Sequence, residues 1–267
     1  MKKNLLLAGL LLAFSLGAVA QNNATTQNTT TTQNNVKAKR YKSYAFGFKL
    51  GPNFNWIGST TGEAQNERLK TDFNLGFDAE FYFTDNYAIV TGLNVNFING
   101  RYTYEDMRDP YATESFKMGT VDRTFKTTAF EIPLMVKMMT EQFGLFKYFA
   151  ELGVGFGLSP RVNVKDTFQF DQETNPIPLD NDIYRRASEE YTSLRFDVRG
   201  AFGLQYTIQG TTRVFADVYY AHNFLNSIQW IGKNYRKYYN GNKDLGERPN
   251  NLNVVQNQFG IEVGILF

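Results

Sequence analysis

The chain has 267 residues, of which 42% are hydrophobic and 16% aromatic, and its formal net charge is +2 at pH 7. No cysteine is present, which excludes disulfide bonds and thiolate metal sites. The nearly neutral charge gives no indication of nucleic-acid binding, and no apolar run after the first twenty residues is long enough for a transmembrane helix.

The N-terminus has the pattern of a cleaved secretory signal peptide over residues 1–20. Met1–Lys3 is a short basic start, Leu5–Val19 is apolar, and Ala18–Ala20 provides small residues for cleavage. A membrane-anchoring helix is the alternative, but the run is short and no stop-transfer pattern follows. Because no cysteine follows, a lipoprotein anchor is excluded.

Residues 21–43 form a polar leader. Gln21–Val36 is almost entirely Asn, Gln, Thr and Ala, and the basic stretch Lys37–Lys42 follows it. This composition offers too little apolar surface to offset the entropy lost on ordering, so we expect the leader to be disordered. A role in contacting a partner or an anionic surface is an alternative for which no motif stands out.

From residue 44 to 267 the sequence repeats one pattern, in which bulky apolar residues alternate with small or polar residues. This period of two is typical of β-strands with one apolar and one polar face. Pro133 interrupts one segment, where we expect a bulge or a missing hydrogen bond. The pattern predicts eight strands, near Tyr44–Trp56, Asp72–Phe83, Tyr87–Phe97, Lys126–Met138, Tyr148–Leu158, Thr192–Ile208, Arg213–Asn223 and Gln256–Phe267.

The connections between these segments alternate in length. Short ones, Thr84–Asn86, Thr140–Phe146 and Gln209–Thr212, follow the second, fourth and sixth segments. Long polar ones follow the odd-numbered segments, at Ile57–Lys70, Gly100–Thr124, Ser159–Tyr191 and Asn226–Leu252. Short periplasmic turns and long external loops joining an even number of strands are typical of outer-membrane barrels. The predicted fold is therefore all-β, an eight-stranded antiparallel transmembrane β-barrel in the outer membrane.

A soluble lipocalin-like barrel is the competing architecture, with its apolar faces turned inward. Two features argue against it. The acidic faces are rich in glycine, and the aromatic residues of the first segment, Phe46, Phe48, Phe54 and Trp56, would overfill the interior of an eight-stranded barrel.

Four segments resemble the PorT-like outer-membrane β-barrel family of Bacteroidota: Phe46–Phe54, Phe130–Lys137, Glu151–Gly157 and Gly260–Gly264. The resemblance covers about Tyr44–Phe267 and implies a barrel in the outer membrane. The named member of that family is associated with type IX protein secretion and gliding-related export. The resemblance therefore implies, without a loop motif particular to that member, an accessory role in secretion.

Twelve charged residues fall on the predicted inward faces: Lys49, Asp72, Asp78, Glu80, Glu131, Lys137, Glu151, Arg195, Asp197, Arg199, Asp217 and Glu262. Ionised groups in a narrow interior must be paired, so we interpret the set as a plug of salt bridges and hydrogen bonds. Because acids outnumber bases, a cation or proton path is the alternative, although a barrel of this size leaves no open aqueous channel.

No catalytic, cofactor-binding or metal-binding residues are predicted. Hydrolytic barrels need a nucleophile or activated water together with a base and a group that orients it. The chain's one histidine, His222, lies at the external end of the seventh segment on the lipid-facing side. We interpret it as an anchor in the aromatic interface belt.

Two external loops carry distinctive residues. Trp230–Tyr239 interleaves basic and aromatic side chains, which could stack on sugars or hold the phosphates of lipopolysaccharide. The simpler interpretation is an extension of the last two strands beyond the membrane. Asp171–Arg186 resembles an ordinary solvated loop.

The sequence therefore predicts a non-catalytic component of the cell envelope without a cofactor. Its expected partners are outer-membrane lipid and lipopolysaccharide, with type IX secretion components as the specific hypothesis. The competing hypothesis is a stand-alone surface barrel whose external loops bind glycan, lipopolysaccharide or a host surface.

Overall fold

The computed structural model describes residues 43–59, 65–66, 69–108, 117–170, 175–178, 183–227 and 254–267. The predicted signal peptide and almost all of the leader lie outside them. The elements are β1 Tyr44–Ser59, β2 Gln65–Asn66, β3 Lys70–Tyr82, β4 Tyr87–Arg108, β5 Lys117–Met139, β6 Phe146–Leu158, β7 Val162–Gln169, β8 Ile177–Pro178, β9 Arg185–Arg186, the 3₁₀ turn η2 Ser188–Glu190, β10 Leu194–Gln209, β11 Thr212–Asn223 and β12 Val254–Leu266. None of the helices in these ranges has the length and apolar character to cross a membrane.

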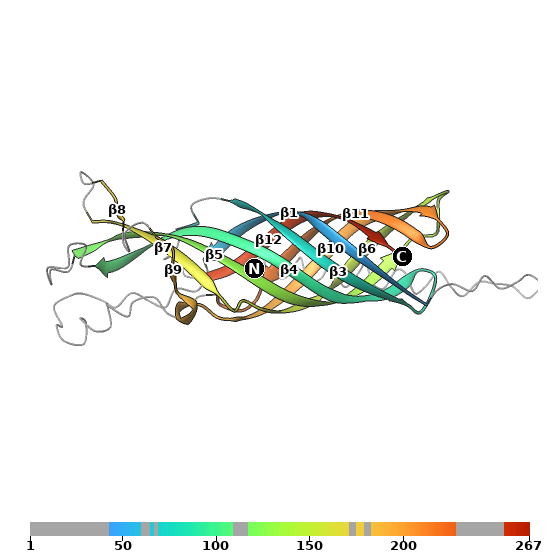
Figure 1. Ribbon diagram of the computed structural model, residues 1–267, viewed down its shortest axis with the longest axis horizontal. Coiled ribbons are helices and arrows are strands. Elements are labelled where there is room, and N and C mark those ends of the chain that lie inside the picture. Colours follow the sequence, from blue (N-terminus) through green and yellow to red (C-terminus); the bar gives the residue numbers. More distant parts are fainter. Residues whose placement is uncertain are drawn as a thin grey trace, which may run out of the picture. The chain divides into compact units, whose positions relative to one another are not determined.

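Eight long strands form a closed antiparallel barrel (Figure 1). The order of pairing is β1, β3, β4, β5, β6, β10, β11 and β12, and the last strand pairs with the first, for example Leu50 with Val263. Each strand therefore has two hydrogen-bonded neighbours, which removes the free edges that a sheet would otherwise expose. The predicted eight-stranded barrel is confirmed.

The two faces of the wall differ as the alternation predicted. Phe48 and Phe202 point outward and are 62% and 60% exposed, whereas the inward Lys137 is 1% exposed. The apolar exterior can contact lipid, and the polar side chains of the interior can pair with one another. This arrangement is the reverse of the lipocalin-like alternative, which is therefore wrong.

Two prolines interrupt the ladders without shifting the register. The pairing of β4 with β5 passes from Thr91–Leu134 directly to Asn94–Glu131, with Pro133 in the gap. Proline has no N–H to donate, so a local loss of pairing is expected there. Of the two predicted outcomes at Pro133, a bulge or a missing hydrogen bond, the structure shows the second. Pro52 in β1 causes the same gap opposite β12.

Glycines on β12 make room for large inward side chains of the neighbouring strand. A Cβ atom built on Gly260 would lie 2.4 Å from the ring of Tyr219, and one built on Gly264 would lie 2.4 Å from the ring of Phe215. The absence of side chains at these two glycines lets aromatic rings fill a narrow interior.

The two ends of the barrel are unequal. Short turns join the strands at one end, and Gly210 in one of them has φ +62°, which favours glycine. At the other end β4 and β5 remain paired as far as Arg108 and Lys117. The prediction of a loop over Gly100–Thr124 is therefore wrong for the residues that belong to these two strands. The predicted loop Ser159–Tyr191 likewise contains β7, which pairs with β5 from Thr120 to Thr127.

We call the described residues beyond the barrel wall at this end, 99–108, 117–128 and 161–191 with the gaps given above, the extension (Figure 1). Its inward faces continue the interior of the barrel. They contribute to an apolar cluster that includes Tyr102, Phe125, Val164, Phe168 and Tyr191. A second apolar cluster, with Met139, Phe149 and Phe215, lies at the turn end. Apolar side chains therefore line both ends of the polar interior.

Candidate functional site

The first group of interior charges is centred on Glu262 of β12. Its carboxylate lies 2.6 Å from the Arg199 guanidinium and 3.4 Å from the Lys49 ammonium, and the Asn74 amide donates to it at 2.5 Å. Lys49 also pairs with Asp78 at 3.0 Å. The group joins four barrel strands, β1, β3, β10 and β12. It therefore links the last strand to the first strands across the closure of the barrel.

A second group lies nearer the turn end. The Lys137 ammonium lies 2.6 Å from Glu80 and 3.2 Å from Glu151, and it sits 3.9 Å from the centre of the Phe149 ring. The Tyr82 hydroxyl donates to Glu80. Two carboxylates and an aromatic face thus compensate for the removal of this cation from water.

Neutral donors satisfy the carboxylates nearer the extension. Glu131 accepts hydrogen bonds from the amides of Asn94 and Asn96, each at 3.2 Å. Asp72 accepts from the Asn55 amide at 2.8 Å and from the Asn99 backbone N–H at 2.7 Å. These donors were not predicted as site residues, although the inward asparagines were visible in the alternation.

The structure brings all twelve predicted interior residues to the inward face. Ten are buried, and Asp72 and Glu151 are partly buried. Asp217 stands directly opposite Glu262 on the neighbouring strand, and none of the described residues forms a salt bridge with Asp217. Its Oδ1 atom is buried, and no residue in the described ranges forms a hydrogen bond with it. Like charges placed opposite each other on neighbouring strands repel.

The extension holds its own buried ionic cluster. Arg123 is 1% exposed and bonds both oxygens of Asp166 at 2.6 Å, while its third nitrogen reaches Glu190 at 2.5 Å. Arg185 bonds Glu190 at 2.8 Å and Asp166 at 3.1 Å. Because Arg185 takes part in this cluster, the prediction that Asp171–Arg186 is an ordinary solvated loop is wrong at its C-terminal end; residues 171–174 and 179–182 lie outside the described ranges.

Aromatic residues surround this ionic cluster. The hydroxyls of Tyr102 and Tyr191 lie 2.8 Å apart, and the Arg123 guanidinium lies 5.4 Å from the centre of the Tyr104 ring. Burial raises the pKa of Tyr191 above its ordinary value. Burial also disfavours the charged form of Glu190, but Arg123 and Arg185 outweigh it and lower the pKa of that carboxyl below its ordinary value.

Sequence reasoning missed this cluster because it treated the segments as loops. A signal was present, since the inward set Val121, Arg123 and Phe125 continues the alternation of β5 beyond the boundary predicted at Lys126. The residues Val162, Val164, Asp166 and Phe168 repeat it in β7.

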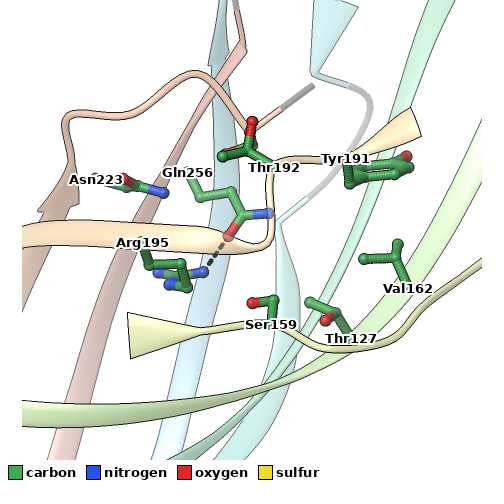
Figure 2. A pocket seen from close by; sticks show the side chains of 9 residues that line it. Thr127, Ser159, Val162, Tyr191, Thr192, Arg195, Asn223 and Gln256 are labelled. Carbon is green, nitrogen blue, oxygen red and sulfur yellow. Dashed lines mark hydrogen bonds between the residues drawn. The ribbon is translucent and has the colours of Figure 1, made fainter. Parts of the chain in front are cut away.

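A small polar pocket lies where β7 departs from the barrel wall (Figure 2). Its lining includes Thr127, Ser159, Arg195, Ser227 and Gln256. Arg195 donates to Gln256, as the dashed line shows, and pairs with Asp197 at 3.2 Å. The space open to the centre of a water-sized molecule is about 10 Å³, which suits one water molecule. The pocket is too small for a substrate.

His222 lies on the outward face, as predicted. Its Nδ1 atom is 2.6 Å from Oδ1 of Asn257, which also accepts a hydrogen bond from the Tyr220 hydroxyl, and its ring meets Phe224 edge to face. Its contacts are those of a polar group within an aromatic belt. In the part of the chain that the structure describes, no three His, Cys, Asp or Glu side chains are placed to hold a metal ion. The aromatic and basic loop Trp230–Tyr239 lies outside the described residues.

A closed antiparallel barrel with an apolar exterior and a paired ionic interior defines an outer-membrane β-barrel protein. The sequence belongs to the family described as "Outer membrane protein beta-barrel domain", whose pattern matches residues 19–229. The protein is therefore located in the outer membrane, as predicted.

Solved structures with a similar fold include three outer-membrane proteins. The attachment invasion locus protein Ail of Yersinia pestis is 12% identical, with 85% of this chain and 100% of that chain covered and a TM-score of 0.35. Neisserial surface protein A is 9% identical, with 82% and 97% covered and a TM-score of 0.35. OprG of Pseudomonas aeruginosa is 12% identical, with 85% and 97% covered and a TM-score of 0.34. No curated protein matches the sequence significantly.

Proposed function

We propose that this protein is a non-catalytic scaffold of the cell envelope and an accessory component of type IX protein secretion, as the PorT-like resemblance implies. The observation that carries the scaffold role is the occupied interior. Charged side chains pair across it, and apolar clusters line both of its ends. A barrel of this kind acts through the surfaces that it presents rather than through a pore or a reactive centre.

The segments that carry the resemblance build this interior. Lys49, Glu131, Lys137, Glu151 and Glu262 all belong to them and all face inward. The segments are also neighbours in the wall, because β5 pairs with β6 and β1 pairs with β12. The resemblance thus concerns residues that hold the barrel together, and it supports a shared scaffold.

The secretion role is tested by capture of the tagged protein from outer membranes solubilised in mild detergent, with co-purifying proteins identified by mass spectrometry. We expect secretion-system components in stoichiometric amounts, and reduced export in a deletion strain. An equally abundant tagged barrel from the same membrane is the control. Normal export in the deletion strain would contradict the role, and recovery of the barrel without companions would favour the stand-alone surface barrel.

A further inference from the structure

A group of basic side chains lies on the outward face at the base of the extension. Lys126 of β5 is paired with Asn163 of β7, which is paired in turn with Arg186 of β9. Arg161 donates from its Nε atom to Oδ1 of Asn163 at 3.2 Å. Lys126, Arg161 and Arg186 are all exposed, and we call these three residues the basic patch.

The register shows why the patch faces outward while its neighbours face inward. Val162 and Val164 are buried in the apolar cluster, so the intervening Asn163 points to the opposite face. Arg186 lies opposite Asn163 and shares that face, whereas Arg185 lies opposite Val164 and enters the buried ionic cluster. The two adjacent arginines therefore have different roles.

The patch lacks compensating charge from the described part of the chain. None of the described carboxylates forms a salt bridge with Lys126, Arg161 or Arg186. The carboxylates of Asp166 and Glu190 are engaged in the buried cluster. Lys126 and Arg186 stand on the strands at either side of Asn163, and adjacent strands lie about 4.8 Å apart, so the three basic residues are gathered around one asparagine. Like charges repel, and a bound anion would offset that repulsion.

The patch lies just beyond the lipid-facing band. Phe130 is 44% exposed and is the exposed apolar residue of β5 nearest to Lys126, four residues away. Arg161 follows the exposed Leu158 of β6 by three residues. Four residues of a tilted strand rise about 10 Å, which places Lys126 at the level of the polar headgroups of the outer leaflet.

An aromatic ring adjoins the cations. The Lys126 ammonium lies 4.4 Å from the centre of the ring of Tyr184, which is 39% exposed. A partly exposed aromatic face beside several cations suits a phosphorylated sugar, because the sugar can stack on the ring while the guanidinium groups bond the phosphate.

We propose that the basic patch binds the phosphorylated disaccharide headgroup of a lipid A molecule in the outer leaflet, with Tyr184 contacting the sugar. The acyl chains then lie along the apolar wall below Phe130 and Leu158. This binding is separate from the proposed secretion role, because it concerns the wall at the membrane surface and needs no protein partner.

The test measures binding of the purified full-length protein in detergent micelles to bisphosphorylated lipid A and to the same lipid with both phosphates removed. We expect the dephosphorylated lipid to bind at least tenfold more weakly. Lys126→Gln, Arg161→Gln and Arg186→Gln should each weaken binding of the phosphorylated lipid several-fold, and the triple variant at least tenfold. Arg186→Lys should retain most of the affinity, because the charge remains.

Lys147→Gln is the matched control, because Lys147 carries the same charge at the turn end, where its ammonium contacts the Asp85 backbone oxygen. Heat-dependent mobility in detergent gels verifies that every variant is folded. Equal binding of the two lipids, unchanged binding in the triple variant or an equal loss in Lys147→Gln would overturn the proposal. It would also be overturned if phosphatidylglycerol or a sulfated oligosaccharide bound the patch more tightly than lipid A.

Discussion

Asp217 and Glu262 show how position decides what a carboxylate contributes. They face each other across β11 and β12, yet Glu262 has Arg199 and Lys49 beside it, whereas the Oδ1 atom of Asp217 has no hydrogen-bond partner among the described residues. An ionised group buried without a partner destabilises the folded state, and removing one member of a buried pair does so as well. The same chemical change at these two sites should therefore have opposite effects.

We predict that Asp217→Asn stabilises the barrel by about 1 kcal/mol and that Glu262→Gln destabilises it by about 3 kcal/mol, because the second change leaves Arg199 without its anion. Urea unfolding in lipid vesicles, followed by tryptophan fluorescence, measures both. Glu105→Gln, at an exposed position of β4, controls for the loss of charge. A loss of stability in Asp217→Asn would show that Asp217 has a stabilising partner.

The extension is an element whose order depends on ionic contacts. Asp166 and Glu190 hold Arg123 in a position that water does not reach, and Arg185 covers the carboxylates from the other side. β7, which contributes Asp166, forms one side of this arrangement and is not part of the closed barrel. The extension can therefore lose order while the barrel stays intact.

We predict that acid loosens the extension before the barrel unfolds. The pKa of Glu190 is lower in the folded protein than its ordinary value of 4.5, so its contribution is present above that value and is lost as pH falls through the folded pKa. Hydrogen exchange of β7 amides, after correction for intrinsic rates, should accelerate as the pH falls below the ordinary value of 4.5 and through the lower folded pKa. Glu190→Gln should raise exchange at pH 7 and flatten this dependence. Unchanged protection in that variant would contradict the prediction.

How much the sequence could predict differs between the wall and the extension. In the wall, lipid outside and charge inside impose a strict alternation, so the inward Lys49 and Glu262 and the outward Phe48 were identifiable. Beyond the membrane the outer face becomes polar too, and the alternation weakens to the inward set Val121, Arg123 and Phe125. The pairing of Arg123 with Asp166 depends on how β7 folds against β5, which local pattern does not determine.

For the whole molecule, the interior is the feature that separates a scaffold from a channel. We predict that the purified barrel gives no ion conductance in planar bilayers, because salt bridges span its interior and Phe149 and Phe215 pack together at the turn end. The double variant Phe149→Ala, Phe215→Ala tests whether the turn end contributes to blocking ion flow. It should also give no conductance, because the interior salt bridges remain. Discrete conductance steps in the unaltered protein would contradict the scaffold role and favour a cation path.

The length of β4 and β5 also has a mechanical consequence. These strands are paired in one register from Tyr87–Met138 to Arg108–Lys117, with a gap only at Pro133, so they run from the turn end through the membrane and out into the extension. A pull on the extension along the strand axis acts on these hydrogen bonds in shear, so many must yield together rather than one after another. A partner that binds the extension would therefore transmit a pulling force directly to the membrane-embedded wall, because the same paired strands form both.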